Sequence, residues 1–381
     1  MTKVLFEANF RVHSMFRWFF LFPPEGFEFL SNVKPFQPPN VLMKYAQTAF
    51  GFPHKFPIQL AESLQGSFRR TEAALTFSHG HLVLRPSPWV LYLERVTQPV
   101  GFNQRVYVMA KRLIEKYIAK DNCKAVLAFS DCQRRVILGN LRVPKLEEKT
   151  SVLLPSVPSR TLTSFDERRD IRLLFVGSSN SLSKDEFLVK GGREAIESYV
   201  KLKSIYPRVK MTVISTLPDA LSAKYKSIDG LTLIKHPIPW SRLLNELYRS
   251  DIFIHPSYHD MATVVLDAMS IGLPVITTDL GGNREIITDG LTGLLVEPSR
   301  RIVYESGDSA NGPPRSWLDS VRVEADQGVV EGIVLKARML IDDLSLRKRI
   351  SENAWNEVSR GRLSIEKRNA KLKSVFSEAL E

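Results

Sequence analysis

Between residues 171 and 277, short apolar runs alternate with helix-length segments, and this alternation constrains the fold more than any other feature of the chain. Ile171–Val176 is a continuous apolar run, as in parallel strands buried on both faces. Strand–helix–strand repetition predicts an α/β fold with a doubly wound parallel sheet, whose ligands bind at the carboxyl ends of the strands. Further strands are predicted at Lys210–Ile214, Leu231–Ile234, Asp251–His255 and Pro274–Thr277, with helices at Gly192–Ser204, Trp240–Ser250 and Thr263–Ile271.

The first part of the chain has a looser α/β pattern. Residues 156–170 are rich in Ser, Thr, Pro and charge, which is typical of a linker. We therefore expect one domain over residues 1–158 and a second over 159–360, followed by a helix over 361–381 that packs back on the first domain. A long charged helix is predicted over Leu344–Leu380. Strands are predicted in the first part at Lys3–Ala8, Ala73–Phe77, Trp89–Leu93, Ala125–Phe129 and Ser151–Leu154, with helices at Gln104–Ala119 and Asp131–Leu138.

Composition narrows the class of protein. Hydrophobic residues make up 44% and charged residues 25% of the chain, an ordinary globular composition. No apolar run approaches the roughly 20 residues of a membrane span, and the N-terminus lacks a secretory signal pattern. These features predict a cytoplasmic protein. The cysteines, Cys123 and Cys132, suggest neither a disulfide framework nor a metal site.

Positive charge and phenylalanine concentrate at the N-terminal end. Residues 1–155 hold 21 Lys and Arg against 11 Asp and Glu, and 12 of the 21 Phe precede residue 57. The segment Phe16–Phe22 is aromatic and basic at once, which suits the surface of an anionic membrane. A core helix or a loop under the domain explains it equally well. Nucleic acid is disfavoured as a partner, because no nucleic-acid motif is recognisable.

Two strand ends in the second half carry residues suited to phosphate binding. Gly177 and Ser178 follow one strand, and Lys190 stands before a Gly-Gly helix start, where its amine can reach a phosphate. A solvated loop lysine is the ordinary alternative. After the strand ending at His255, a helix opens near Thr263, and its first-turn N–H groups form an anion site. Asp267 can accept hydrogen bonds from ribose hydroxyls, or can act only on the helix dipole.

A third strand end, Thr277–Glu285, holds a Gly pair that allows a sharp turn into a helix. Glu285 is expected to cap that helix rather than to act in catalysis.

The run DIFIHPSYHDMATVVLDAMSIGLPVITTDLGGNREIITDGLTGLLVEP, from Asp251, resembles the donor-binding core of the family-four retaining glycosyltransferases (glycosyl transferases group 1). The likeness extends back through LVKGG and LLFVGSSNS to about Arg172, and is weak over the first 150 residues. It implies a GT-B fold, with two Rossmann-like domains facing a central cleft. It also implies that a nucleoside-diphosphate sugar is held by Gly177, Ser178, Lys190, His236, Ala262, Thr263, Val264 and Asp267.

The catalytic side departs from the family pattern. The family usually has two glutamates with seven residues between them. Here seven residues separate His259 from Asp267, and Asp260 is one residue too close. Either Asp260 or His259 takes the acidic position. Ser178 stands where an Arg is common, and the missing cation either weakens phosphate binding or shifts it to Lys184. In the first domain, His79 or His81 fits the histidine that faces the transferred sugar, with Glu94 as a further acid.

The resemblance implies a hexosyl-transferring enzyme that retains anomeric configuration and needs neither a metal nor a cofactor besides its nucleotide-sugar substrate. The expected acceptor is a glycan, a lipid-linked glycan or a growing polysaccharide, reached from the cytoplasmic face of a membrane. A second hypothesis is a non-catalytic nucleotide-sugar-binding subunit that scaffolds a partner transferase, motivated by the irregular acidic pair. An epimerase or phosphorylase on the same architecture is less favoured.

Overall fold

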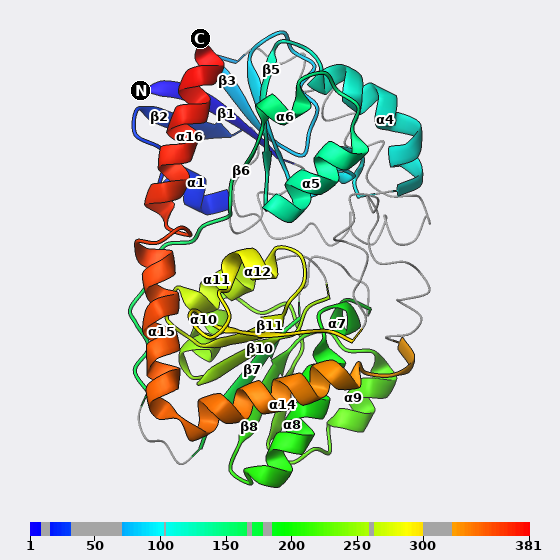
Figure 1. Cartoon of the computed structure of the whole chain (residues 1–381), viewed down its shortest axis with the longest axis vertical. Helices are drawn as coiled ribbons and strands as arrows, with labels where there is room; N and C mark the ends of the chain where they lie inside the picture. The colour runs from blue at the N-terminus through cyan, green and yellow to red at the C-terminus, as the bar shows by residue number, and fades with distance from the viewer. Residues whose placement is uncertain are drawn as a thin grey trace. The chain divides into compact units, whose positions relative to one another are not determined.

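The computed structural model describes residues 1–8, 16–31, 71–102, 104–165, 170–177, 185–258, 263–299 and 322–381. They form two compact units (Figure 1). Unit 1 comprises the described residues up to Ser156 together with Ile365–Glu381, and unit 2 comprises the described residues between them. The final helix thus belongs to the unit formed by the start of the chain. Each unit is an α/β layer structure around one parallel sheet, as the sequence predicts.

The sheet of unit 1 has six parallel strands in the order β2-β1-β3-β4-β5-β6. The chain order reverses between β1 and β3, so this is the switch point at which ligands of doubly wound sheets bind. The strands are β1 (Thr2–Ala8), β2 (Phe27–Ser31), β3 (Leu75–His79), β4 (Trp89–Leu93), β5 (Cys123–Ala128) and β6 (Thr150–Val152). The helices are α1 (Arg17–Leu21), the short 3-10 helix η2 (Gln98–Val100), α4 (Gln104–Ile118), α5 (Asp131–Asn140), α6 (Leu146–Lys149) and α16 (Ile365–Leu380).

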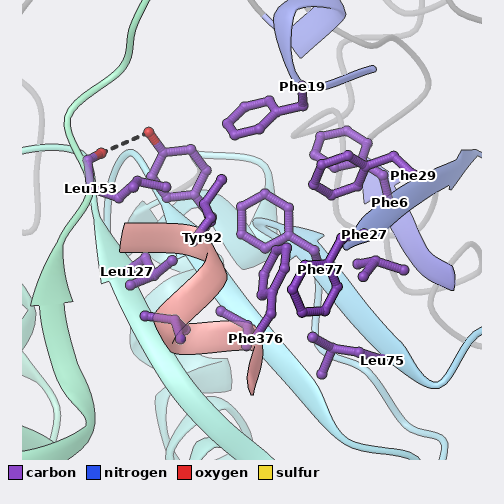
Figure 2. Packing of buried hydrophobic residues seen from close by; sticks show 14 of the residues in the cluster. Phe6, Phe19, Phe27, Phe29, Leu75, Phe77, Tyr92, Leu127, Leu153 and Phe376 are labelled. Atoms are coloured by element: carbon purple, nitrogen blue, oxygen red, sulfur yellow. Dashed lines mark hydrogen bonds between the residues drawn. The ribbon is translucent and has the colours of Figure 1, made fainter. Parts of the chain in front are cut away.

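Two apolar clusters cover the two faces of this sheet. Side chains alternate along β4, so that Val90 and Tyr92 enter one cluster while Trp89, Leu91 and Leu93 enter the other. The first cluster packs against α16, and Figure 2 shows Phe376 of that helix among the phenylalanines of β1, β2 and β3. In the same view the Tyr92 hydroxyl donates a hydrogen bond to the Leu153 carbonyl at 2.8 Å. The second cluster packs under α4 and α5.

The aromatic segment near the N-terminus belongs to the first cluster. Phe16 and Phe19 are buried, with 0% and 2% of their surface exposed, which confirms the core-helix interpretation for these two residues. Arg368 of α16 holds α1 in place, because its Nη2 donates to the carbonyls of Trp18 at 3.1 Å and Phe22 at 2.7 Å. Burial lowers the pKa of Arg368 to about 10. Phe19 is therefore unavailable for insertion into a membrane.

The sheet of unit 2 also has six parallel strands, in the order β12-β11-β10-β7-β8-β9. Its switch point lies between β7 and β10. The strands are β7 (Arg172–Val176), β8 (Lys210–Ile214), β9 (Leu231–Ile234), β10 (Ile252–His255), β11 (Val275–Thr278) and β12 (Leu294–Val296). The helices are α7 (Asp185–Val189), α8 (Gly192–Ile205), α9 (Asp219–Tyr225), α10 (Trp240–Tyr248), α11 (Thr263–Met269), α12 (Asn283–Ile286), α14 (Gln327–Asp342) and α15 (Leu344–Ser359).

The prediction of one long helix over Leu344–Leu380 is wrong. Two helices, α15 and α16, are separated by residues 360–364, where the chain passes from unit 2 to unit 1. Gly361 donates its N–H to the Asn356 carbonyl at 2.9 Å, and a Cβ at this glycine would lie 2.1 Å from the Glu357 carboxylate. The break therefore occurs at a residue that only glycine fits.

Two further features concern membrane and redox chemistry. No helix within the described ranges has the length and apolarity needed to cross a bilayer. Cys123 and Cys132 are both buried thiols.

Candidate functional site

The carboxyl ends of β7 and β10 form the switch point of unit 2, and the turn between α7 and α8 packs directly on it. Tyr258, after β10, donates its backbone N–H to the Val189 carbonyl of α7 at 3.0 Å. A Cβ at Gly191 would lie 2.2 Å from the Pro256 carbonyl oxygen, so the α7–α8 turn approaches β10 as closely as backbone permits. Gly191 also has a φ of 74°, in the left-handed region that favours glycine.

Gly177 ends β7 with a similar close approach. Its backbone N–H donates to the Ile214 carbonyl at 2.8 Å, and a Cβ there would lie 2.2 Å from the Ser215 hydroxyl oxygen. The glycine thus permits tight packing between the ends of β7 and β8. Because its N–H is already used, Gly177 can border a phosphate but cannot offer that hydrogen bond to it.

Lys190 stands at the centre of this arrangement and is only 6% exposed. It follows α7 and precedes Gly191, with its backbone N–H donating to the Glu186 carbonyl at 2.9 Å. His255, the last residue of β10, is 1% exposed and stacks on Phe253, with ring centroids 5.6 Å apart. Burial, together with a smaller contribution from the nearby charge of Lys190, lowers the pKa of His255 to about 3. The switch point therefore presents the lysine charge over a neutral histidine.

A buried carboxyl group anchors the loop that follows β10. Glu194 of α8 is 2% exposed, and its Oε1 accepts hydrogen bonds from the Tyr258 hydroxyl at 3.0 Å and from the Asp326 N–H at 3.1 Å. Asp326 in turn caps α14 by accepting from Gly328 N–H at 3.0 Å. Burial raises the pKa of Glu194 to about 7, while its hydrogen bonds oppose that change.

Glu194 should make stability depend on pH near neutrality. Its folded-state pKa of about 7 lies above the ordinary 4.5, so the folded protein holds this proton more tightly than the unfolded chain. The resulting stabilisation is complete below about pH 4.5 and is lost as pH rises to about 7. Relative to Glu194→Gln, which keeps the acceptor oxygen, the wild type should lose up to roughly 3 kcal/mol over that interval.

The measurement is urea unfolding of the wild type and Glu194→Gln at a series of pH values, with their difference plotted against pH. Glu197→Gln on the same helix is the control, because Glu197 accepts its hydrogen bond from Gln327 at the surface. A difference between wild type and Glu194→Gln that stays constant with pH would contradict the assignment.

Asp267 lies on α11 and is 9% exposed. Its carboxylate faces Arg160, a contact that was not predicted from the sequence. Arg160 Nη2 lies 3.5 Å from Asp267 Oδ1, and Arg160 also hydrogen bonds to the Ser270 side chain. The Arg160 backbone N–H donates to the Ser270 carbonyl at 2.9 Å. The segment read as a linker is therefore attached to unit 2 by α11. Any ribose hydroxyl bound by Asp267 would share the carboxylate with a guanidinium.

The other residues predicted to bind the donor lie at the carboxyl edge of the sheet of unit 2 or outside the described residues. His236 follows β9, two strands from β7 and thus roughly 10 Å along the edge. Its carbonyl accepts from the Thr216 hydroxyl at 3.1 Å. Thr263 and Val264 begin α11 and are half-buried. Outside the described residues lie Ser178, Lys184, His259, Asp260 and Ala262.

Glu285 is the third residue of α12 and lies in its first turn, the position expected of a capping acid. Its carbonyl accepts a hydrogen bond from Arg362 Nη1 at 3.1 Å. The neighbouring Arg284 forms an ion pair with Asp279 at 3.0 Å.

In unit 1, His79 ends β3, directly at the switch point, where it is paired in register with Ala8 of β1. The predicted strand stopped two residues earlier, at Phe77, and this boundary is wrong because the ladder with β4 continues through His79. His79 is 8% exposed and lies against the ring of Phe16, with centroids 4.2 Å apart. The fold thus brings this imidazole to the sheet position most typical of ligand contact.

One nitrogen of His79 faces both a donor and an acceptor. The Nε2 atom lies 2.9 Å from Gln98 Nε2 and 3.2 Å from Glu94 Oε1. Gln98 is oriented by its own Oε1, which accepts the Glu94 N–H at 2.7 Å, so its amide nitrogen points to the histidine. Deprotonated Nε2 can accept from Gln98, and protonated Nε2 can donate to Glu94. His79 consequently has a partner in either protonation state, as a proton-transferring group requires.

His81 lies in a different environment. Among the described residues its Nε2, which is buried, has no hydrogen-bond partner, and its backbone carbonyl accepts from the Ser78 hydroxyl at 2.8 Å. Burial lowers the pKa of His81 to about 3, with a smaller contribution from His79. At neutral pH this ring is uncharged and has no proton to give beyond its neutral N–H. Of the two predicted histidines, only His79 has the surroundings of an acid–base group.

Three residues that support the site were not predicted from the sequence, because they belong to no motif. Gln98, Arg160 and Glu194 contact the predicted site residues or their loops, yet none lies in a recognisable pattern. His255 was within the recognised run, and its place at the end of a strand was a usable signal. Long-range partners such as Arg160 and Asp267, 107 positions apart in sequence, are visible only once the chain is folded.

Comparison with known proteins gives a consistent result for unit 2. Residues 189–303 match the family described as Glycosyl transferases group 1. The D-inositol 3-phosphate glycosyltransferase of Kribbella flavida is 29% identical over 136 residues, covering 33% of this chain and 31% of that protein. The chain spans about a third of the length of the curated relatives it matches first.

Solved structures match both units. Alr3699/HepE of Anabaena, in complex with UDP and glucose, aligns with a TM-score of 0.61 and 14% identity, covering 99% of each chain. Sucrose-phosphate synthase of Thermosynechococcus elongatus aligns with a TM-score of 0.64 and 10% identity, covering 99% of this chain and 98% of that one. At such identities the likeness is one of fold. Residues 189–303 thus match the glycosyl transferases group 1 model, and the likeness to these solved structures gives the two parallel sheets the GT-B fold.

Proposed function

We propose that the protein transfers a hexosyl group from a nucleoside-diphosphate sugar, held by unit 2, to an acceptor, with retention of anomeric configuration. The observation that carries this proposal is the position of Lys190. It is nearly buried at the switch point, directly before Gly191, where a Cβ would lie 2.2 Å from the Pro256 carbonyl oxygen. The family match over residues 189–303 supports the same conclusion.

The chemistry asks the protein to stabilise negative charge on the departing diphosphate. Lys190 supplies a positive charge in a site where water is largely displaced, and the start of α11 at Thr263 supplies backbone N–H groups. Asp267 and His236 are proposed to hold the ribose and the base. These groups are sufficient for leaving-group stabilisation without a metal ion. In the family-four pattern, either Asp260 or His259 contacts the sugar.

We propose His79 as the unit 1 residue that hydrogen bonds to the transferred sugar or moves a proton during transfer. The acceptor is proposed to be a glycan, a lipid-linked glycan or a polysaccharide, reached at the inner face of a membrane. The positive charge of residues 1–155 supports an anionic surface as the neighbour of unit 1.

The test is consumption of donor. Purified protein is incubated with UDP-, GDP-, ADP- and CMP-sugars without metal, and released nucleotide is measured with Lys190→Ala as the control. We expect release from one donor class and none from the variant. Inactivity of the wild type toward every donor, with membrane extract present as an acceptor source, would contradict transfer.

The second candidate is a nucleotide-sugar-binding subunit that does not catalyse transfer. The spacing of Asp260 and Asp267, one residue shorter than in the family pattern, favours it. Calorimetric binding of one donor that Lys190→Ala abolishes, without any turnover by the wild type, would establish this alternative.

A further inference from the structure

Helix α4 (Gln104–Ile118) has two apolar faces, and only one of them is needed for the fold. Its inner face carries Tyr107, Ile114 and Ile118, which are buried in the second cluster of unit 1. In Figure 1, α4 lies on the side of the unit 1 sheet opposite α16. The outer face carries a second set of apolar side chains that pack against nothing in this cluster.

These outer residues are unusually exposed for their type. Val108 is 66% exposed, Met109 is 85% exposed and Leu113 is 41% exposed. Met109 and Leu113 are four positions apart, so their side chains are neighbours on the helix surface. Val108 lies about 100° around the helix axis from Met109, on the same outer side. Exposed apolar residues that stand singly need no explanation, but three contiguous ones on a helix mark a contact surface.

The exposed charged side chains described on α4 itself are basic. Arg112, Lys116 and Lys120 are exposed at spacings of four residues and continue the same outer face toward and beyond the end of α4. The acid of the helix, Glu115, is half-buried and engaged elsewhere, since its Oε1 accepts the Arg142 N–H at 2.8 Å. Long basic side chains beside a short apolar strip can reach headgroups while the strip enters the acyl boundary.

We infer that the outer face of α4 docks on an anionic lipid bilayer. The combination of Val108, Met109 and Leu113 with a row of Lys and Arg complements such a bilayer in both polarity and charge. Nucleic acid is less well matched, because the aromatic side chain beside this face, Tyr117, is half-buried and has Lys120 Nζ over its ring at 4.1 Å from the centroid, which leaves a base little room to stack. The inference deepens the membrane part of the proposed function, and moves the contact from the buried Phe19 to α4.

The experiment measures cosedimentation of the whole protein with phosphatidylcholine vesicles, prepared with and without phosphatidylglycerol. Two variants test the two parts of the surface: Val108→Ser/Met109→Ser/Leu113→Ser, and Arg112→Glu/Lys116→Glu. Because these side chains are exposed, both variants should keep the fold, which circular dichroism and the melting temperature verify. The matched control is Leu335→Ser/Met339→Ser, which alters apolar residues that are 60% and 41% exposed on α14 of unit 2.

The wild type and the α14 variant should bind vesicles that contain phosphatidylglycerol, and each α4 variant should partition at least about tenfold more weakly. Equal binding to purely zwitterionic vesicles, or unchanged binding by either α4 variant, would overturn the inference. So would binding of a single-stranded oligonucleotide that the α4 variants lose, if the wild type ignores vesicles. Donor consumption is assayed on the same samples. Its absence from the wild type would refute transfer without affecting the vesicle result.

Discussion

Lys190→Met should lower kcat/KM for the nucleotide-sugar donor by about 10²–10³-fold, the range found when one preorganised charge-stabilising group is removed. Lys190 is 6% exposed, so in the proposed site its charge would act on the leaving diphosphate with little screening by water. Methionine keeps most of the volume and the unbranched shape of the lysine stem. The loss should appear in kcat as well as in donor affinity, because negative charge on the diphosphate grows as the bond to the sugar breaks.

Two companion variants sharpen this result. Lys190→Arg keeps the charge and should retain more activity than Lys190→Met. Lys201→Met removes an exposed lysine of α8 that pairs with Glu331, and should leave kcat/KM unchanged. Steady-state kinetics on the three variants, with melting temperatures to exclude misfolding, gives the comparison. Equal activity of Lys190→Met and wild type would show that the diphosphate is neutralised elsewhere.

His79→Ala should lower turnover by about 10²–10⁴-fold while leaving the affinity for the free nucleoside diphosphate within a few-fold. The reason is that His79 Nε2 has both a donor, Gln98, and an acceptor, Glu94, within hydrogen-bonding distance. Nucleotide affinity depends on residues of unit 2 and should not register the change. Single-turnover kinetics and calorimetry with the free nucleotide separate the two effects.

His81→Ala is the matched comparison, because sequence reasoning left both histidines open. His81 has a pKa of about 3 and a buried Nε2 without a partner among the described residues, so its loss should reduce turnover less than about tenfold. Both substitutions remove a buried ring and lower stability, which melting temperatures will report. A larger catalytic loss in His81→Ala than in His79→Ala would reverse the assignment.

The second sheet was predictable because buried parallel strands leave a continuous apolar signature. Lys210–Ile214 and Leu231–Ile234 match strands β8 and β9 residue for residue. The predictions for β7 and β10 start one residue early, that for β11 is shifted by one residue at both ends, and β12 was not predicted. Right-handed crossover connections limit the possible strand orders without fixing one. The expected position of the site, at the carboxyl edge near a switch point, holds for any doubly wound order.

The interpretation of the first unit from sequence was weaker for a physical reason. Phe16–Phe22 satisfies the compositional requirements of a membrane surface and of a core equally, and only the packing of Phe19 beneath Arg368 decides between them. The cation lies 4.5 Å from the ring centroid, in a helix 349 residues further along the chain. The exposure of apolar residues on α4 likewise could not be predicted, because periodicity alone does not tell which of two apolar faces packs on the sheet.

The candidate site also contains some residues that could be predicted from the sequence and others that could not. Gly177 and Lys190 were identified because they lie in runs that resemble the donor-binding core of a known family, and His79 because it follows a predicted strand. The partners that orient the loops and acids, namely Glu194, Gln98 and Arg160, come from helices and connecting segments with no local pattern. Their roles depend on hydrogen bonds between residues that the fold brings together, such as Tyr258 and Glu194, 64 positions apart.

A crystal structure of the protein soaked with the nucleoside diphosphate of the preferred donor tests the central claim most directly. We expect the diphosphate to lie at the carboxyl ends of β7 and β10, with a phosphate oxygen within hydrogen-bonding distance of Lys190 Nζ and with Gly177 beside it. Nucleotide density at any other edge of the sheet of unit 2, or nucleotide bound with Lys190 turned away from the phosphates, would contradict it.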